Sequence, residues 1–126
     1  MGTRSYIFTE TQNDNFLGSY CHWDGYPEGV GVRLLNNYTE QDKINKVCNL
    51  GGFSTLQDTV VETAEKQYND EPVAEVNTGK DALEYGDMVD YIYVYEDRNW
   101  WFYETNYGEE SPTRRHLETY LSMKHG

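Results

Sequence analysis

The sequence predicts a single α+β domain, in which two β-hairpins form a largely antiparallel four-stranded sheet packed with short helices and a C-terminal helix. Two pairs of short runs rich in aromatic and β-branched residues predict the strands. The segment between the pairs carries apolar residues at helical spacing. The length of 126 residues suits one domain spanning residues 1–126, and the 12 tyrosines predict a core rich in aromatic rings.

The strands are expected in two hairpins. The first joins Ser5–Thr9 to Leu17–Trp23, and the second joins Tyr91–Tyr95 to Trp100–Tyr103. If Tyr95 lies opposite Trp100, both faces of the second hairpin carry apolar side chains. Helices would cover one face, and the other would contact a partner, a ligand or a second copy of the chain in a homodimer.

Two short helices are expected after the first hairpin. The first presents one apolar face, formed by Val30, Leu34 and Tyr38. The second begins at a capping box made by Thr39 with Asp42 and ends before Gly51-Gly52. The apolar stripe of this second helix consists of Ile44, Val47 and Cys48.

A third helix and a C-terminal helix complete the predicted elements. The third is capped by Ser54 with Gln57, and its apolar residues are Val60, Val61 and Ala64. Residues 69–80 are expected to form an irregular acidic connection. The last helix would begin at Ser111-Pro112, and its buried stripe would consist of Leu117, Tyr120 and Leu121.

Acidic residues dominate the second half of the chain. The net charge is -12, and the segment from Asp58 to Asp97 holds 12 acidic residues against two lysines. Such a field repels phosphate backbones, so we expect no direct binding to nucleic acid, whereas a host protein with a basic surface would be attracted. The alternative is a solvated face that keeps the protein soluble. The candidate partner-binding residues are Glu62, Glu65, Asp70, Glu71, Glu75, Asp81, Glu84 and Asp87.

A basic pair near the C-terminus has an unfavourable predicted position. Arg114 and Arg115 would lie in the first turn of the last helix, where the helix dipole disfavours positive charge. We therefore expect a salt bridge from this pair to the acidic segment, within the protein or across a dimer.

The run Gly18–Pro27 gathers His, Asp, Cys and three aromatic residues before a Gly/Pro turn. On an extended strand His22 and Asp24 point to one face, where they could form a structural hydrogen bond, contact a ligand or perform acid–base chemistry. The ligand would be a nucleotide-like molecule that stacks on the aromatic rings. The candidate ligand-binding residues are Tyr20, His22, Trp23, Asp24 and Tyr26.

The two cysteines do not indicate catalysis. Cys21 would face away from the neighbouring His22, which argues against a nucleophile, and Cys48 fits a core position. No ligand spacing indicates a metal site, and no cofactor is expected. No apolar run is long enough to span a bilayer and no signal-peptide pattern is present, so we expect a soluble cytoplasmic protein with both thiols reduced.

The run Tyr20–Pro27, YCHWDGYP, is followed by a short Leu-Leu helix ending at Tyr38 and later by Leu50–Leu56, LGGFSTL. This combination resembles a family of uncharacterised small proteins encoded by bacteriophages and prophages. The resemblance implies a viral context, in which small acidic proteins often antagonise host defence.

The expected function is that of a non-enzymatic phage accessory protein that blocks a host protein through its acidic surface, as anti-CRISPR and anti-restriction proteins do. One alternative is sequestration of a nucleotide-like signalling ligand around His22–Tyr26. Another is a small hydrolase that uses His22 and Asp24.

Overall fold

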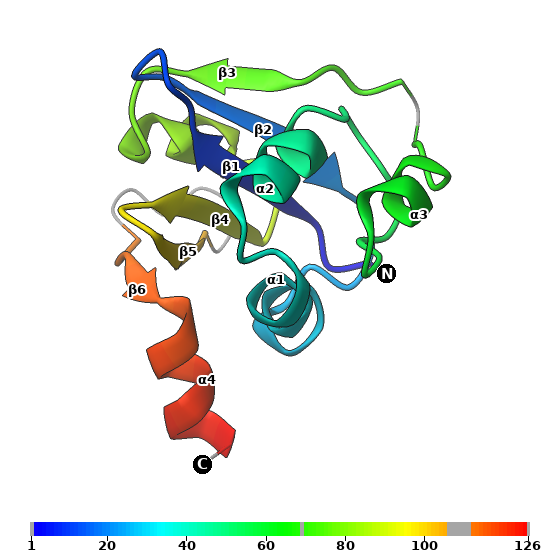
Figure 1. Cartoon of the computed structure of the whole chain (residues 1–126). Coiled ribbons are helices and arrows are strands. Elements are labelled where there is room, and N and C mark those ends of the chain that lie inside the picture. The colour runs from blue at the N-terminus through cyan, green and yellow to red at the C-terminus, as the bar shows by residue number, and fades with distance from the viewer. Residues whose placement is uncertain (1, 69, 106–111, 126) are drawn as a thin grey trace.

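The computed structural model describes residues 2–68, 70–105 and 112–125. A six-stranded mixed sheet with the order β3-β2-β1-β4-β5-β6 organises the fold (Figure 1). Two antiparallel hairpins form its middle, as predicted. Their strands are β1 (Ser5–Glu10) with β2 (Phe16–Cys21), and β4 (Tyr91–Glu96) with β5 (Asn99–Glu104).

The predicted four-stranded, largely antiparallel sheet is wrong in two respects. The hairpins meet through a parallel pair, β1 with β4, and two short strands extend the edges. These are β3 (Ala74–Val76), inside the segment expected to be irregular, and β6 (Arg115–His116). A parallel pair requires a long connection, which the helical middle of the chain supplies, and strands of two or three residues are too short to show a period-2 pattern.

The second hairpin has the register that the sequence left as a condition. Tyr95 lies opposite Trp100, and Glu96 pairs with Asn99 on either side of a two-residue turn. Both turn residues have positive φ, 54° at Asp97 and 64° at Arg98. This left-handed geometry matches the twist of the flanking strands, although neither residue is the glycine that such turns favour.

The first two helices are confirmed, and the second starts one residue later than predicted. A π-helical turn, η1 (Pro27–Gly31), runs directly into α1 (Val32–Asn37), and α2 (Gln41–Cys48) follows. The residues predicted to be buried in these helices, from Val30 to Cys48, all lie in the core. The predicted capping box is wrong, because Glu40 occupies the N-cap of α2 and its side chain makes no capping bond.

The last two helices begin later than predicted. Thr59, rather than Ser54, caps α3 (Val60–Ala64) by accepting a hydrogen bond from the Glu62 amide. The C-terminal helix α4 (Leu117–His125) begins after the two residues that pair with β5, so Pro112 lies outside it. The other half of that predicted start, Ser111, lies outside the described residues.

The expected salt bridge from the basic pair to the acidic segment is present. Arg114 Nη2 lies 2.9 Å from Glu96 Oε1, and the guanidinium also stacks over Trp101. The neighbouring Arg115 lies over the ring of Tyr120. Both arginines precede α4, so they avoid the helix N-terminus and its unfavourable dipole.

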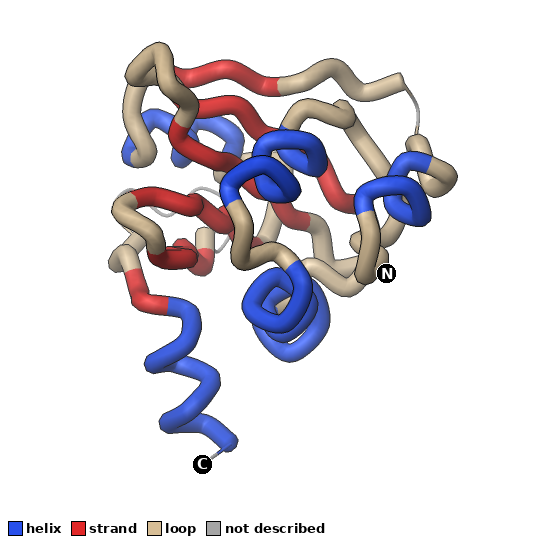
Figure 2. The backbone as a smooth tube through the Cα atoms, in the orientation of Figure 1, coloured by secondary structure: helices blue, strands red, loops and turns tan. Residues whose placement is uncertain are grey.

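Apolar clusters cover both faces of the sheet. Ile7, Tyr93 and Phe102 pack under the helices α1, α2 and α4. On the opposite face, Tyr6, Phe8 and Ile92 pack against the 3₁₀ helix η2 (Lys80–Tyr85) and its flanks. Figure 2 shows these helices on either side of the strands. Much of the second face is therefore closed by the chain's own residues, which reduces the apolar surface available to a second copy.

Candidate functional site

The chain leaves the sheet at the end of β2 and enters a corner, residues Tyr20–Pro27. Beyond Cys21 the backbone amides of His22 and Trp23 donate to the carbonyls of Phe53 and Ser54. The buried Tyr93 hydroxyl donates to the Gly25 carbonyl at 2.6 Å, which ties the corner to β4. The corner is thus held by contacts from distant segments.

Asp24 is not on a strand. Its φ is 60°, and its carbonyl accepts a hydrogen bond from the amide of Val30 as the chain turns into η1. The expectation that Asp24 shares a strand face with His22 is wrong, because period-2 alternation stops when the strand ends at Cys21.

His22 is held by aromatic residues. Its Nδ1 lies 2.8 Å from the Tyr20 hydroxyl and its Nε2 lies 3.4 Å from the Tyr68 hydroxyl. The imidazole stacks on the Tyr68 ring, with centroids 4.3 Å apart, and meets the Trp23 ring edge-on. Burial and the Arg4 guanidinium lower the pKa of His22, which favours the neutral ring. Its ring nitrogens face phenol oxygens rather than the Asp24 carboxylate.

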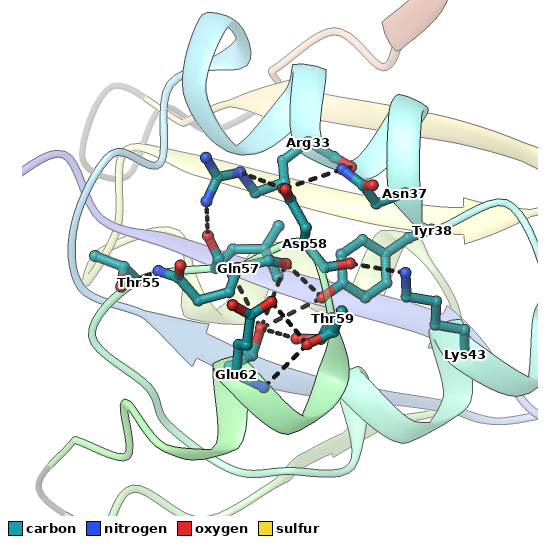
Figure 3. Close-up of polar contacts among 11 residues, drawn as sticks. Arg33, Asn37, Tyr38, Lys43, Thr55, Gln57, Asp58, Thr59 and Glu62 are labelled. Atoms are coloured by element: carbon teal, nitrogen blue, oxygen red, sulfur yellow. Dashed lines mark hydrogen bonds and ion pairs between the residues drawn. The ribbon is translucent and has the colours of Figure 1, made fainter.

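Asp24 and Tyr26 line a different feature, the corner cavity, with a volume of about 160 Å³. Its other lining residues are Gly29, Val30, Arg33, Thr55, Leu56 and Gln57. Arg33 is already engaged, because it donates to the Leu56 carbonyl at 2.7 Å and pairs with Asp58 at 3.3 Å (Figure 3). The volume is below the ordinary size of a small-molecule pocket, so a whole nucleotide does not fit inside.

The five predicted ligand-binding residues therefore fall into two groups. Tyr20, His22 and Trp23 lie in one aromatic cluster, and Asp24 and Tyr26 line the corner cavity. Sequence reasoning missed Tyr68, which completes the first group, and Arg33 and Gln57, which line the second. Tyr68 is 46 positions from His22, and no local pattern marks such a partner.

A larger cavity lies beside the aromatic cluster. This tyrosine cavity has a volume of about 300 Å³, and its lining residues are Arg4, Tyr6, Tyr20, Glu71, Asp87 and Met88. Tyr6 and Tyr20 are paired across β1 and β2, and their rings meet at 5.6 Å between centroids. Burial, followed by the nearby Glu71 carboxylate and two neighbouring tyrosines, raises the pKa of Tyr6 to about 12. The cavity thus joins aromatic rings to carboxylates.

The predicted partner-binding carboxylates follow the chain from α3, past the edge strand β3 and through η2, to Asp87 in the segment after η2. We call this set the acidic surface. Six of the eight are exposed and two are half-buried, namely Glu71 and Asp81. Two are oriented by hydrogen bonds: Glu62 accepts from the Thr59 hydroxyl, and Glu75 accepts from the Asn15 amide. The remaining members are Glu65, Asp70, Glu84 and Asp87.

The cysteines are core residues. Cys21 and Cys48 are free thiols with no exposed surface. Burial raises the pKa of Cys21 to about 12 and also raises that of Cys48. A thiolate at neutral pH is therefore disfavoured at both positions. Within the described ranges, no group of three or more His, Cys, Asp or Glu residues could hold a metal ion.

Comparisons of the chain with protein-family models, with curated proteins and with solved structures give no match. Of the helices that the structure describes, none is long and apolar enough to cross a membrane. The features of this protein that bear on its function are the cavities, the aromatic cluster and the distribution of charge.

Proposed function

We propose that this protein is a non-enzymatic binding protein that blocks a basic surface of another protein through its acidic surface. The observation that carries this proposal is the exposure of six of the eight carboxylates of the acidic surface, in a chain of net charge -12. An excess of exposed carboxylates steers a basic partner into contact and repels nucleic acid.

The resemblance of the YCHWDGYP motif to phage proteins gives this proposal its context. In that context the protein is a bacteriophage accessory protein in the cytoplasm of a bacterial host. Its partner is a host-defence protein with a basic nucleic-acid groove, and it antagonises that partner as anti-CRISPR and anti-restriction proteins do. An acidic surface supports this role because it competes for the contacts that a phosphate backbone would make.

The two alternative functions receive less support from the geometry. Sequestration of a nucleotide-like ligand would need a single binding site formed by residues His22–Tyr26. In the structure these residues lie in two places, an aromatic cluster and a small cavity. Hydrolysis required His22 to act with Asp24, whereas the imidazole faces Tyr20 and Tyr68.

The proposal is tested by finding a partner and measuring how salt affects its binding. The full chain is used to capture proteins from a bacterium carrying restriction and CRISPR systems, and the affinity for each captured protein is measured at low and high salt. We expect a basic partner whose nuclease activity is inhibited and whose affinity falls steeply as salt rises. A partner bound equally well at both salt concentrations would contradict the proposal.

Matched variants locate the contact. The double variant Glu65→Gln/Glu84→Gln removes two exposed charges from the acidic surface, and Glu40→Gln/Glu118→Gln removes two exposed charges elsewhere. We expect the first to weaken binding about tenfold and the second about twofold or less, because screened charges act mainly at short range. Equal effects would show that only net charge matters, which would overturn the assignment to this surface.

A further inference from the structure

The tyrosine cavity lies on the face of the sheet opposite α1 and α2. Tyr20 from β2 presents its half-buried ring there. The neighbouring Tyr6 from β1 is only 4% exposed, and Tyr85 packs on its ring with centroids 4.7 Å apart. Both Tyr6 and Tyr20 belong to paired strands, so their rings are held by the sheet. The cavity therefore has a rigid aromatic wall.

Two carboxylates complete the lining of this cavity. Glu71 lies near enough to Tyr6 to raise the pKa of that phenol, after the larger effect of burial. Burial raises the pKa of Tyr20, Arg4 opposes this shift, and Tyr68 and Glu71 add to it. Asp87 lines the cavity from the segment after η2. Among the described lining residues Arg4 is the single cation, so their carboxylates give the cavity an excess of negative charge.

Aromatic rings combined with carboxylates suit a flat organic cation. A guanidinium stacks on tyrosine faces and donates hydrogen bonds to carboxylates in a planar fork, whereas an ammonium group acts as a strongly hydrated point charge. Both carboxylates belong to the acidic surface, so a basic protein bound there would bring cationic side chains to the mouth of the cavity.

We propose that the tyrosine cavity receives the side chain of an arginine from the basic partner, with its guanidinium against the half-buried ring of Tyr20 and hydrogen-bonded to Glu71 and Asp87. This inference rests on the proposed function and identifies its anchoring contact. The volume of about 300 Å³ suits one side chain inserted from a protein surface. Arg4 lies at the same cavity and repels the incoming cation, so it limits the affinity.

The probe is a short peptide, acetyl-Gly-Arg-Gly-amide, and its control carries citrulline, which has a similar shape and no charge. Binding to the full chain is followed by the NMR shifts of the Tyr6 and Tyr20 ring protons. We expect the arginine peptide to bind at least about fivefold more tightly than the citrulline peptide. Equal affinity of the two peptides would overturn the proposal.

Charge-matched variants separate the cavity from the acidic surface as a whole. Glu71→Gln and Asp87→Asn each remove one carboxylate from the cavity, and Glu65→Gln removes one from the acidic surface outside it. We expect each cavity variant to weaken arginine binding about fivefold, Glu65→Gln to change it less than about twofold, and Arg4→Gln to strengthen it. Retention of the native amide NMR spectrum confirms that each variant is folded.

The outcomes distinguish this inference from the proposed function. If Glu71→Gln weakens arginine binding no more than Glu65→Gln does, the cavity proposal is wrong, while salt-sensitive capture of a basic partner can still stand. If no basic partner is captured and the arginine peptide nevertheless binds in the cavity, the proposed function fails and the cavity remains a guanidinium site.

Discussion

The imidazole of His22 lies nearly parallel to the ring of Tyr68, at 17° and with 4.3 Å between the ring centroids. This stack joins the end of β2 to the segment that follows α3. With the hydrogen bond to Tyr20 it holds the histidine as an aromatic, uncharged component of the corner.

His22 is expected to titrate below its ordinary pKa of 6.5, because burial and Arg4 disfavour the imidazolium. The unfolded chain then binds this proton at higher pH than the folded chain does, so the free energy of unfolding rises with pH in that range. The stability contributed by neutral His22 is present above pH 6.5 and is lost as the pH falls from 6.5 towards the folded pKa. NMR titration of the ring proton measures this midpoint.

Two variants check the cause of the shift in His22. Arg4→Gln is expected to raise the midpoint by removing a neighbouring charge, whereas Arg33→Gln, which removes a charge from the corner cavity, should leave it nearly unchanged. A midpoint at or above 6.5 in the unmodified protein would show that the ring is neither desolvated nor repelled.

The buried hydroxyl of Tyr38 is expected to stabilise the segment between α2 and α3. It donates to the Gln57 carbonyl at 2.6 Å and lies 3.3 Å from the Thr63 hydroxyl (Figure 3). Tyr38→Phe should lower the free energy of unfolding by about 1 kcal/mol, because the half-buried Gln57 carbonyl loses its closer donor and keeps only the Thr63 hydroxyl at 3.5 Å. Urea denaturation measures this change. The matched variant at the exposed Tyr26, Tyr26→Phe, should change it by less than about 0.5 kcal/mol.

The two ion pairs of the described residues are expected to differ in strength. Arg114 and Glu96 lie 2.9 Å apart with side chains 31% and 24% exposed, whereas Arg33 and Asp58 lie 3.3 Å apart and are 41% and 63% exposed. Double-mutant cycles should give about 0.5–1 kcal/mol for the first pair and less for the second, since exposure increases screening. High salt should reduce both couplings. A larger coupling for the exposed pair would contradict this reading.

The backbone of the turn between β4 and β5 is strained at Arg98, and a glycine there would relieve the strain. Arg98 has a φ of 64°, which is unfavourable for a residue with a Cβ atom. Arg98→Gly should raise the free energy of unfolding by about 0.5–1 kcal/mol, because glycine adopts this conformation freely. The control, Lys46→Gly in the helical backbone of α2, should lower it by about 1 kcal/mol. Thermal unfolding of both variants compares the two effects.

Both thiols are expected to be unreactive in the folded protein. Cys21 and Cys48 have no exposed surface, and burial raises both pKa values. Modification by a soluble thiol reagent at neutral pH should be more than about a hundredfold slower in the native protein than in denaturant. Rapid labelling of Cys21 without unfolding would show that the corner opens on its own.

Local sequence patterns predicted many of the strands and helices. The alternation and turn signal around Tyr95 and Trp100 predicted a hairpin that the structure confirms, and the spacing of Val30, Leu34 and Tyr38 predicted a buried helical face. Helix starts were less predictable. Thr59 and Glu62 form a capping box at the start of α3 that the choice of Ser54 overlooked. Glu40 takes the N-cap of α2 without a side-chain capping bond, so no capping pattern marks that start.

The candidate site was harder to predict from the sequence than the fold was. The sequence placed Tyr20, His22 and Trp23 close together, and the structure finds them in one cluster. The sequence did not indicate that Tyr68 stacks on His22, or that Arg4 and Glu71 line a cavity with Tyr6. These residues come from separate segments, so no periodicity or spacing connects them.

The sequence by itself determined the two hairpins, the amphipathic helices and the acidic character of the second half, because each follows from local periodicity or from composition. Only the tertiary structure decided that β1 pairs in parallel with β4 and that β3 and β6 extend the sheet. It also separated Asp24 from His22 and placed carboxylates beside Tyr6 and Tyr20. The physical reason is that such arrangements depend on contacts between distant segments, whose energies appear only when the whole core packs together.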